Sequence, residues 1–207
     1  MGSRLIVIGL GPGHPDYILP IALKKAGEVK FLIGSGRGLQ SFPEFENQSR
    51  ILLKGNVENM LRSIEESWLQ GDTAVLVSGD PGYYSLLDAM KAEWPERQLE
   101  VIIGIGSLPL AFAKVGIPWH QATLASFHGR IPTKEVLEYQ VGKKLGLLTD
   151  PREAPDKIGQ ALFNRGWPKE TTVWICENLT YSNERIKKYK LGRLPEKVEG
   201  PAVWVVE

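Results

Sequence analysis

The sequence predicts an α/β protein of two domains, with a mainly parallel sheet in the first. Two observations support this fold class. In the first half, short aliphatic or β-branched runs alternate with helical patterns, as parallel strands joined by crossover helices require. Around Gly116-Ile117-Pro118 this rhythm changes. We therefore place an N-terminal domain at residues 1–116 and a C-terminal domain at residues 117–207.

The predicted elements of the first domain follow from apolar spacing and from start and stop signals. Met60, Ile64 and Trp68 recur at helical intervals in a helix over 57–69, which Asn56 caps and Gly71 follows. Further helices are predicted at 83–93 and 108–115. The strands are the short apolar runs at 5–8, 29–33, 74–77 and 99–103.

The second domain has fewer helical patterns. One helix is predicted over 154–164, begun by Pro155 and ended by Gly166. The charged segment 183–190 is either a strand or one arm of a hairpin. The predicted strands are 122–127, 145–148, 172–176 and 202–206.

Composition excludes several classes of protein. Formal net charge is +1, from 25 basic and 24 acidic residues, so no broad positive field for nucleic acid exists. Cys176 is the single cysteine, which excludes an intrachain disulfide and fits a reducing compartment. No apolar stretch approaches the roughly 18–20 residues of a membrane span, and the start has no signal-peptide pattern. We expect a soluble, cytoplasmic protein without a protein-bound metal, because three scattered histidines and one cysteine lack ligand spacing.

Three loops of small residues follow predicted strands. They are Gly9-Leu10-Gly11-Pro12-Gly13, Ser78-Gly79-Asp80-Pro81-Gly82 and Gly104-Ile105-Gly106-Ser107. In an open α/β sheet, ligands lie beyond the carboxyl ends of the strands, where glycine allows close approach of the backbone. Asp80 either caps a helix with Pro81 at its first position or offers a carboxylate to a ligand, and both roles are compatible.

A dinucleotide fold is the first alternative for the glycine loop. Gly9 and Gly11 fit the fingerprint, but Gly13 comes one position too early, and Pro12 and Pro15 oppose an immediate helix. The second predicted strand also lacks the acidic residue that binds a ribose. NAD or FAD binding is therefore disfavoured, and no Walker loop is present.

These residues resemble the tetrapyrrole (corrin/porphyrin) methyltransferase family. The resemblance rests on Gly9–Gly13, on the stretch from Asp16 to Pro20, on Gly79-Asp80-Pro81 and on the Ile103–Ser107 loop, and it covers nearly the whole chain. The branch that methylates C5 of precorrin-7 or cobalt-precorrin-7 matches best. Its features are Leu-Ala-Phe-Ala at 110–113, Ser-x-His-Gly-Arg at 126–130, Glu-Asn-Leu at 177–179 and Glu-Arg-Ile at 184–186.

The resemblance implies a tetrapyrrole methylase fold with a mainly parallel N-terminal sheet and a mixed C-terminal sheet. Its active site lies in an interdomain cleft, with S-adenosylmethionine (SAM) as methyl donor. It also implies a homodimer, a corrin precursor as substrate and no catalytic residue that stands out. Because the chain ends at Glu207, C15 methylation and decarboxylation are expected in a separate protein. The implied SAM-binding residues are Gly9, Leu10, Gly11, Pro12, Gly13, Gly79, Asp80, Pro81, Tyr83, Ser107 and Leu108. The implied substrate-binding residues are His128 and Arg130, with Arg37 and Arg185 as weaker candidates.

Three positions depart from the family pattern. Pro20 replaces a threonine, while Ile103 and Gly106 replace the proline and first serine of the third loop. These changes argue against side-chain hydrogen bonds from that loop, and we expect its contacts with a ligand to come from the backbone. Two other functions remain open at this point: another member of the superfamily, such as diphthine synthase, or a non-catalytic SAM- or tetrapyrrole-binding protein.

Overall fold

The computed structural model describes residues 2–129, 131–150 and 154–207, and the chain divides into two compact units, Met1–Gly106 and Ser107–Glu207. The division therefore falls ten residues before the boundary that the sequence suggested. Helix α5 (Ser107–Val115) belongs to the second unit because its side chains pack against that unit's sheet. A Cβ on Gly146 would lie 2.8 Å from the Phe112 ring and 3.0 Å from Leu108.

The first unit contains a parallel sheet in the order β3-β2-β4-β1-β5, as its alternating pattern predicted. The edge strand β3 was not predicted, because its four residues include Ser49 and Arg50 and none of them is buried. The strands are β1 (Leu5–Gly9), β2 (Phe31–Gly34), β3 (Ser49–Leu52), β4 (Thr73–Val77) and β5 (Glu100–Ile102).

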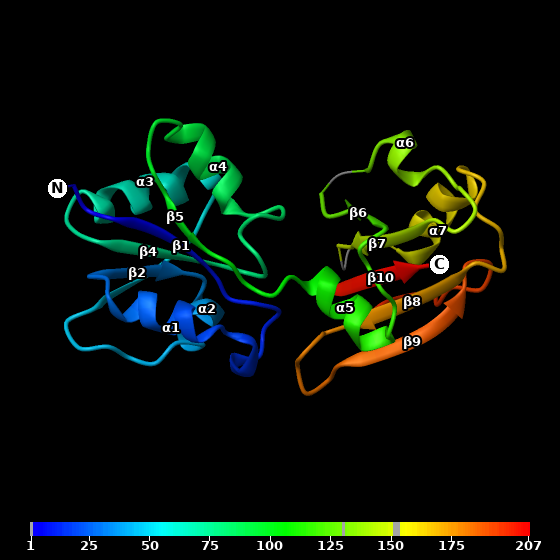
Figure 1. The fold of residues 1–207 in the computed structure, drawn as a ribbon, viewed down its shortest axis with the longest axis horizontal. Helices are drawn as coiled ribbons and strands as arrows, with labels where there is room; N and C mark the ends of the chain where they lie inside the picture. Colours follow the sequence, from blue (N-terminus) through cyan, green and yellow to red (C-terminus); the bar gives the residue numbers. More distant parts are fainter. Residues whose placement is uncertain (1, 130, 151–153) are drawn as a thin grey trace. The chain divides into compact units, whose positions relative to one another are not determined.

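Helices cover both faces of this sheet (Figure 1). Ile6 and Ile8 of β1 pack in one hydrophobic cluster with α1 (Pro20–Gly27), while α2 (Gly36–Gln40) adjoins the same side. Leu5 and Val7 point to the opposite cluster, which contains residues of α3 (Val57–Trp68) and α4 (Leu86–Glu93). The period of two along β1 therefore buries every one of its side chains.

The predicted start of one helix in this unit is correct, and that of another is wrong. Asn56 caps α3 as predicted, its side chain accepting from the Asn59 N–H at 2.9 Å. Helix α4, however, begins at Leu86 rather than at residue 83, and Ser85 is its cap. Asp80 is therefore not a helix cap. Pro81 to Ser85 form turns instead, in which Tyr84 adopts a positive φ of 51°. The sequence pattern also missed α1, α2 and the short 3-10 helix Pro15–Tyr17.

The second unit has a mixed sheet in the order β6-β7-β10-β8-β9, in which only β6 and β7 are parallel. The charged segment 183–190, predicted to be either a strand or one arm of a hairpin, contains the edge strand β9. Its pairing with β8 is antiparallel. The strands are β6 (Ala122–Ser126), β7 (Lys144–Leu148), β8 (Thr172–Glu177), β9 (Arg185–Lys190) and β10 (Ala202–Val206).

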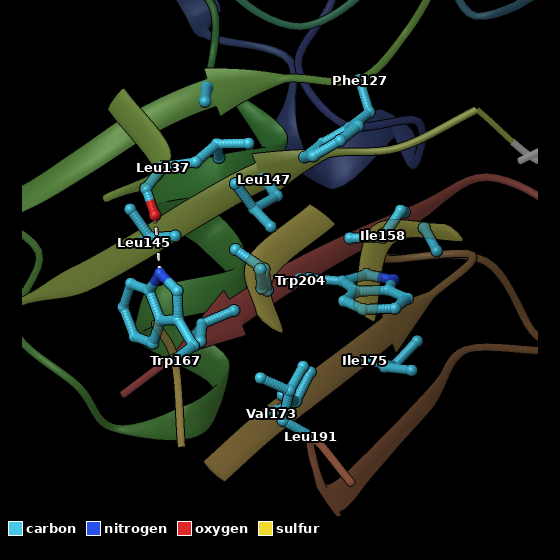
Figure 2. Packing of buried hydrophobic residues seen from close by; sticks show 14 residues of the cluster. Phe127, Leu137, Leu145, Leu147, Ile158, Trp167, Val173, Ile175, Leu191 and Trp204 are labelled. Atoms are coloured by element: carbon cyan, nitrogen blue, oxygen red, sulfur yellow. Dashed lines mark hydrogen bonds between the residues drawn. The ribbon is translucent and has the colours of Figure 1, made fainter. Parts of the chain in front are cut away.

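This sheet also has helices on both faces. Gly146 faces α5, whereas its neighbours Leu145 and Leu147 face the cluster that includes α7 (Pro155–Phe163) and α6 (Lys134–Leu137). Figure 2 shows this cluster around Trp204, with the Trp167 indole N–H donating to the Leu137 carbonyl at 2.7 Å. Each unit therefore has its own sheet and its own buried core.

Neither a membrane-spanning helix nor a metal-ligand cluster occurs among the described residues. No helix among residues 2–129, 131–150 and 154–207 is long and apolar enough to cross a membrane. Within the same residues, no group of three or more His, Cys, Asp or Glu is placed to hold a metal ion. Cys176 is buried, and burial raises the pKa of its thiol to about 12, so it is not a reactive thiolate at neutral pH.

Candidate functional site: the glycine loops and the second-unit strand ends

The loops after β1 and β4 lie at a topological switch point of the first sheet. These two strands are parallel neighbours, so their carboxyl ends meet at the same edge. From that edge, β1 leads to α1 on one face of the sheet and β4 leads to α4 on the other. Connections that leave neighbouring strands toward opposite faces open the crevice where α/β proteins bind ligands.

Hydrogen bonds join the first two loops into one surface. Gly11 donates to the Gly79 carbonyl at 3.2 Å, and Gly79 donates to the Gly11 carbonyl at 2.9 Å. Leu10 donates to the carbonyl of Val77, the last residue of β4, at 2.9 Å. The residues that the sequence singled out in two separate loops are therefore in direct contact.

Glycine is needed at positions 9 and 79 of these loops for two different physical reasons. A Cβ on Gly9 would lie 2.5 Å from the Gly104 nitrogen and 2.7 Å from the Gly79 oxygen, so the three loops touch backbone to backbone. Gly79 instead has a left-handed φ of 68°, and a Cβ there would meet nothing within 4 Å. Gly9 is required by internal packing, whereas Gly79 leaves its backbone beside open space.

Asp80 links the second loop to the third. Its Oδ1 accepts from the Gly82 N–H at 2.8 Å, and its Oδ2 accepts from the Gly104 N–H at 3.1 Å. A carboxylate can accept about four hydrogen bonds. Asp80 is only partly buried, so its oxygens retain capacity for a ligand after holding both loops.

Tyr83 carries an unsatisfied polar atom in the same loop. Its hydroxyl is buried and has no hydrogen-bond partner among the described residues, while its ring lies edge-on to Tyr84 at 4.7 Å. Desolvation by burial raises the pKa of this phenol to about 12, so the group stays protonated and is not a base at neutral pH. A buried hydroxyl without a partner is unusual, and a ligand acceptor would satisfy it.

Ser107 and Leu108, the two SAM-binding candidates in the second unit, differ in the groups that they can offer to a ligand. Leu108 is 2% exposed, and its side chain packs against Gly146 of the sheet. It can therefore contribute only backbone groups to a ligand. Ser107 is the first residue of α5 and is partly exposed.

His128 lies just beyond the end of β6, with its side chain 67% exposed. Its Nδ1 is 3.6 Å from Oδ2 of Asp150, which is 5% exposed and follows β7. Asp150 belongs to no motif that the sequence analysis recognised. Arg130 lies outside the described residues, and Arg37 is exposed on α2, which follows the carboxyl end of β2.

Arg185 is engaged by a buried carboxylate. Its guanidinium donates to both oxygens of Glu177, at distances between 2.9 and 3.2 Å, and Glu177 is 3% exposed. Glu177 also accepts from the Glu199 N–H at 2.8 Å. Glu177 of the Glu-Asn-Leu run and Arg185 of the Glu-Arg-Ile run therefore link β8 to β9. This structural role was not evident from the sequence.

Glu184 lies in the turn between β8 and β9 and makes a separate set of contacts. Its carboxylate accepts from Lys114 Nζ at 2.9 Å and from the Thr180 N–H at 2.7 Å. Burial alone would raise the pKa of Glu184, but these two donors outweigh it and hold the pKa below its usual value. The Lys114 contact ties α5 to the turn between β8 and β9.

A parallel sheet with glycine–proline loops at its switch point, followed by a mixed-sheet unit, defines a two-unit α/β protein with a small-ligand site. The model of the Tetrapyrrole (Corrin/Porphyrin) Methylases matches residues 4–195. The chain belongs to this family, whose members are SAM-dependent methyltransferases.

Two curated relatives match along nearly their whole length. The chain is 31% identical to the cobalt-precorrin-7 C(5)-methyltransferase of Salmonella typhimurium, over 98% of each protein. It is 28% identical to the probable cobalt-precorrin-7 C(5)-methyltransferase of Methanocaldococcus jannaschii, over 92% of this chain and 90% of that protein.

Among solved structures, the fold is similar to uroporphyrin-III C-methyl transferase from Thermus thermophilus, which was solved with S-adenosyl homocysteine. The TM-score is 0.77 at 19% identity, over 99% of this chain and 97% of that one. The fold expected from the family resemblance is confirmed.

Proposed function

We propose that this protein transfers the methyl group of SAM to C5 of cobalt-precorrin-7 or of its cobalt-free form. The observation that carries the proposal is the pairing of the two loops through Gly11 and Gly79 at the switch point of the first sheet. The names and near-complete coverage of the two curated relatives support the choice of substrate.

SAM supplies an electrophilic methyl group on a sulfonium, and the protein has to hold and align it. The open backbone at Gly79, the partly exposed Asp80 carboxylate and the unpartnered Tyr83 hydroxyl fit a ligand with amino, hydroxyl and carboxylate groups. We propose as SAM-binding residues those of the first two loops and of the start of α5, with backbone groups alone from Leu108. The proposed set is Gly9, Leu10, Gly11, Pro12, Gly13, Gly79, Asp80, Pro81, Tyr83, Ser107 and Leu108.

A corrin precursor carries several carboxylates, so cationic side chains are the expected contacts. We retain Arg37 and Arg130 as proposed substrate-binding residues, together with His128. Arg185 is the weakest of the four because Glu177 already occupies its guanidinium. The names of both curated relatives mention only C5, so we propose that another catalytic unit carries C15 methylation and decarboxylation.

The first prediction concerns activity. Incubation of the protein with SAM and cobalt-precorrin-7 is expected to add one methyl group to the macrocycle, measured by mass spectrometry, with S-adenosylhomocysteine as co-product. Omission of SAM is the control. SAM binding without any transfer would favour a non-catalytic binding protein, and transfer to a protein histidine instead of the corrin would favour a diphthine synthase.

The second prediction concerns Asp80. Asp80→Ala is expected to raise the Kd for S-adenosylhomocysteine at least about tenfold, measured by calorimetry, because the variant loses a carboxylate that orders two loops and faces the ligand. Asp88→Ala, an exposed carboxylate on α4, is the matched control and should leave the Kd unchanged. Wild-type affinity in Asp80→Ala would remove Asp80 from the cofactor site.

The homodimer implied by the family resemblance is also a proposal. Sedimentation equilibrium is expected to give twice the 23.0 kDa mass of the chain. A monomer at all concentrations would refute it.

A further inference from the structure

Strand register brings a histidine and a carboxylate together in the second unit. β6 and β7 are parallel, with Ser126 paired to Leu148, and the ladder continues through the Phe127 N–H, which donates to the Leu148 carbonyl at 2.8 Å. His128 and Asp150 each lie two residues beyond that pair. Their juxtaposition follows from sheet geometry, and a sequence separation of 22 residues concealed it.

The two groups have opposite exposures. Asp150 is 5% exposed, while the His128 side chain is 67% exposed, and its Nδ1 lies 3.6 Å from Oδ2 of the carboxylate, within ion-pair range. The His128 N–H donates to the Ser126 hydroxyl at 3.1 Å, and Ser126 is buried, which fixes the backbone at this point. Catalytic contacts of this kind often shorten when a substrate binds, and a carboxylate that accepts from Nδ1–H leaves Nε2 as the acceptor.

A surface pair elsewhere in the chain shows the contrast. His14 Nδ1 lies 3.5 Å from Asp16 Oδ2, but these side chains are 50% and 83% exposed. Both side chains of that pair are open to water, and Nδ1 of His14 also accepts from the Asp16 N–H at 3.3 Å. In the His128 pair the carboxylate is buried and the imidazole is accessible, so a buried carboxylate faces an imidazole that solvent reaches.

The proposed reaction needs such a group. The ring carbon attacks the methyl carbon, a C–C bond forms, and the electrons of the S–C bond pass to sulfur, giving a neutral thioether. The macrocycle then carries one extra positive charge. It is neutralised when the C–H bond at the methylated carbon gives its electrons back to the ring and its proton leaves to a base.

We propose that His128 accepts this proton at Nε2, and that Asp150 is the positioning residue that orients the imidazole and stabilises its protonated form. This inference rests on the proposed C-methyltransferase function. It supersedes the substrate-binding role proposed for His128 above, in which the imidazole binds a substrate carboxylate. The two roles differ in the kinetic constant that they control.

Steady-state kinetics with cobalt-precorrin-7 at saturating SAM test the inference. His128→Ala is expected to lower kcat about 100-fold or more, the usual contribution of a general base, while KM for the macrocycle stays within about threefold. Free imidazole is expected to restore at least about tenfold of the lost kcat in this variant. His120→Ala, another exposed histidine of the same unit, is the control and should behave as wild type.

Asp150→Asn tests the positioning role. It is expected to lower kcat about tenfold, and imidazole should not rescue it, because the ring of His128 still occupies its place. Circular dichroism and S-adenosylhomocysteine binding, both unchanged, would show that each variant is folded.

Several results would overturn the inference. They are a wild-type kcat in His128→Ala, a rise in KM with kcat unchanged, which would restore the carboxylate-binding role, or the absence of imidazole rescue. If the wild-type protein binds SAM but does not methylate the corrin, the proposed function fails and this inference fails with it. If the wild type is active and only the variants contradict expectation, the proposed function stands and the inference alone is wrong.

Discussion

Gly104→Ala is expected to lower the free energy of unfolding by about 3 kcal/mol, the upper part of the usual range for overpacking. A Cβ at this position would overlap the carbonyl oxygen of Gly79 and lie 2.8 and 2.9 Å from the C and Cα atoms of Gly9. All of these atoms belong to backbone at the ends of three neighbouring strands, so no side-chain rotation can relieve the clash. Urea denaturation followed by circular dichroism measures the loss.

The same variant is expected to weaken S-adenosylhomocysteine binding, because the third loop would separate from the loop that contains Gly79 and Asp80. Gly36→Ala is the matched control. It lies at the start of α2, where a Cβ would meet only Leu52 at 3.6 Å, and it should be neutral or stabilising by up to about 1 kcal/mol. Equal stability of Gly104→Ala and wild type would show that the three loops do not pack as described.

Glu177→Gln is expected to lower the free energy of unfolding by about 2 kcal/mol, again measured by urea denaturation. The substitution keeps the shape of the side chain but removes the charge that binds Arg185 and the Glu199 N–H inside the protein. Hydrogen bonds to buried charged groups contribute about 1.5–3 kcal/mol. Arg185 is 41% exposed and can be solvated by water in the variant, which limits the loss.

Glu199→Gln is the control for this prediction. Its carboxylate is 66% exposed and 3.9 Å from Arg185, so the change in stability should stay within about 0.5 kcal/mol. Unchanged stability of Glu177→Gln together with a higher KM for the corrin would contradict a structural role for the pair. It would return Arg185 to the substrate site.

The fold was largely predictable because periodicity and end signals are local properties. The four apolar runs of the first half became β1, β2, β4 and β5, and α3 begins at the predicted cap, Asn56. Two of the missed elements, β3 and α2, are short or polar. β3 contains Ser49 and Arg50, and α2 has five residues, two of them glycine, so neither has a recognisable apolar period.

The site was predictable only in part. The glycine loops were recognisable because glycine and proline after a strand mark a turn at the sheet edge. That Asp80 holds Gly104 of the third loop depended on a hydrogen bond between loops far apart in sequence, and Ser85, not Asp80, caps the following helix. The buried partners Glu177 and Asp150 were also hidden, since an acidic residue after a strand is more often a solvated turn residue than a buried one.

The sequence by itself therefore determined most of the strands, the longest helix, the two-unit plan and the family, because each depends on patterns within short segments. Only the tertiary structure decided which loops touch, which carboxylates are buried and which cations already have partners. The pairing of β1 with β4 joins Gly11 to Gly79, and that of β6 with β7 places His128 beside Asp150. Both result from strand register, which is set when whole hydrophobic faces are buried together and so cannot be read from any single segment.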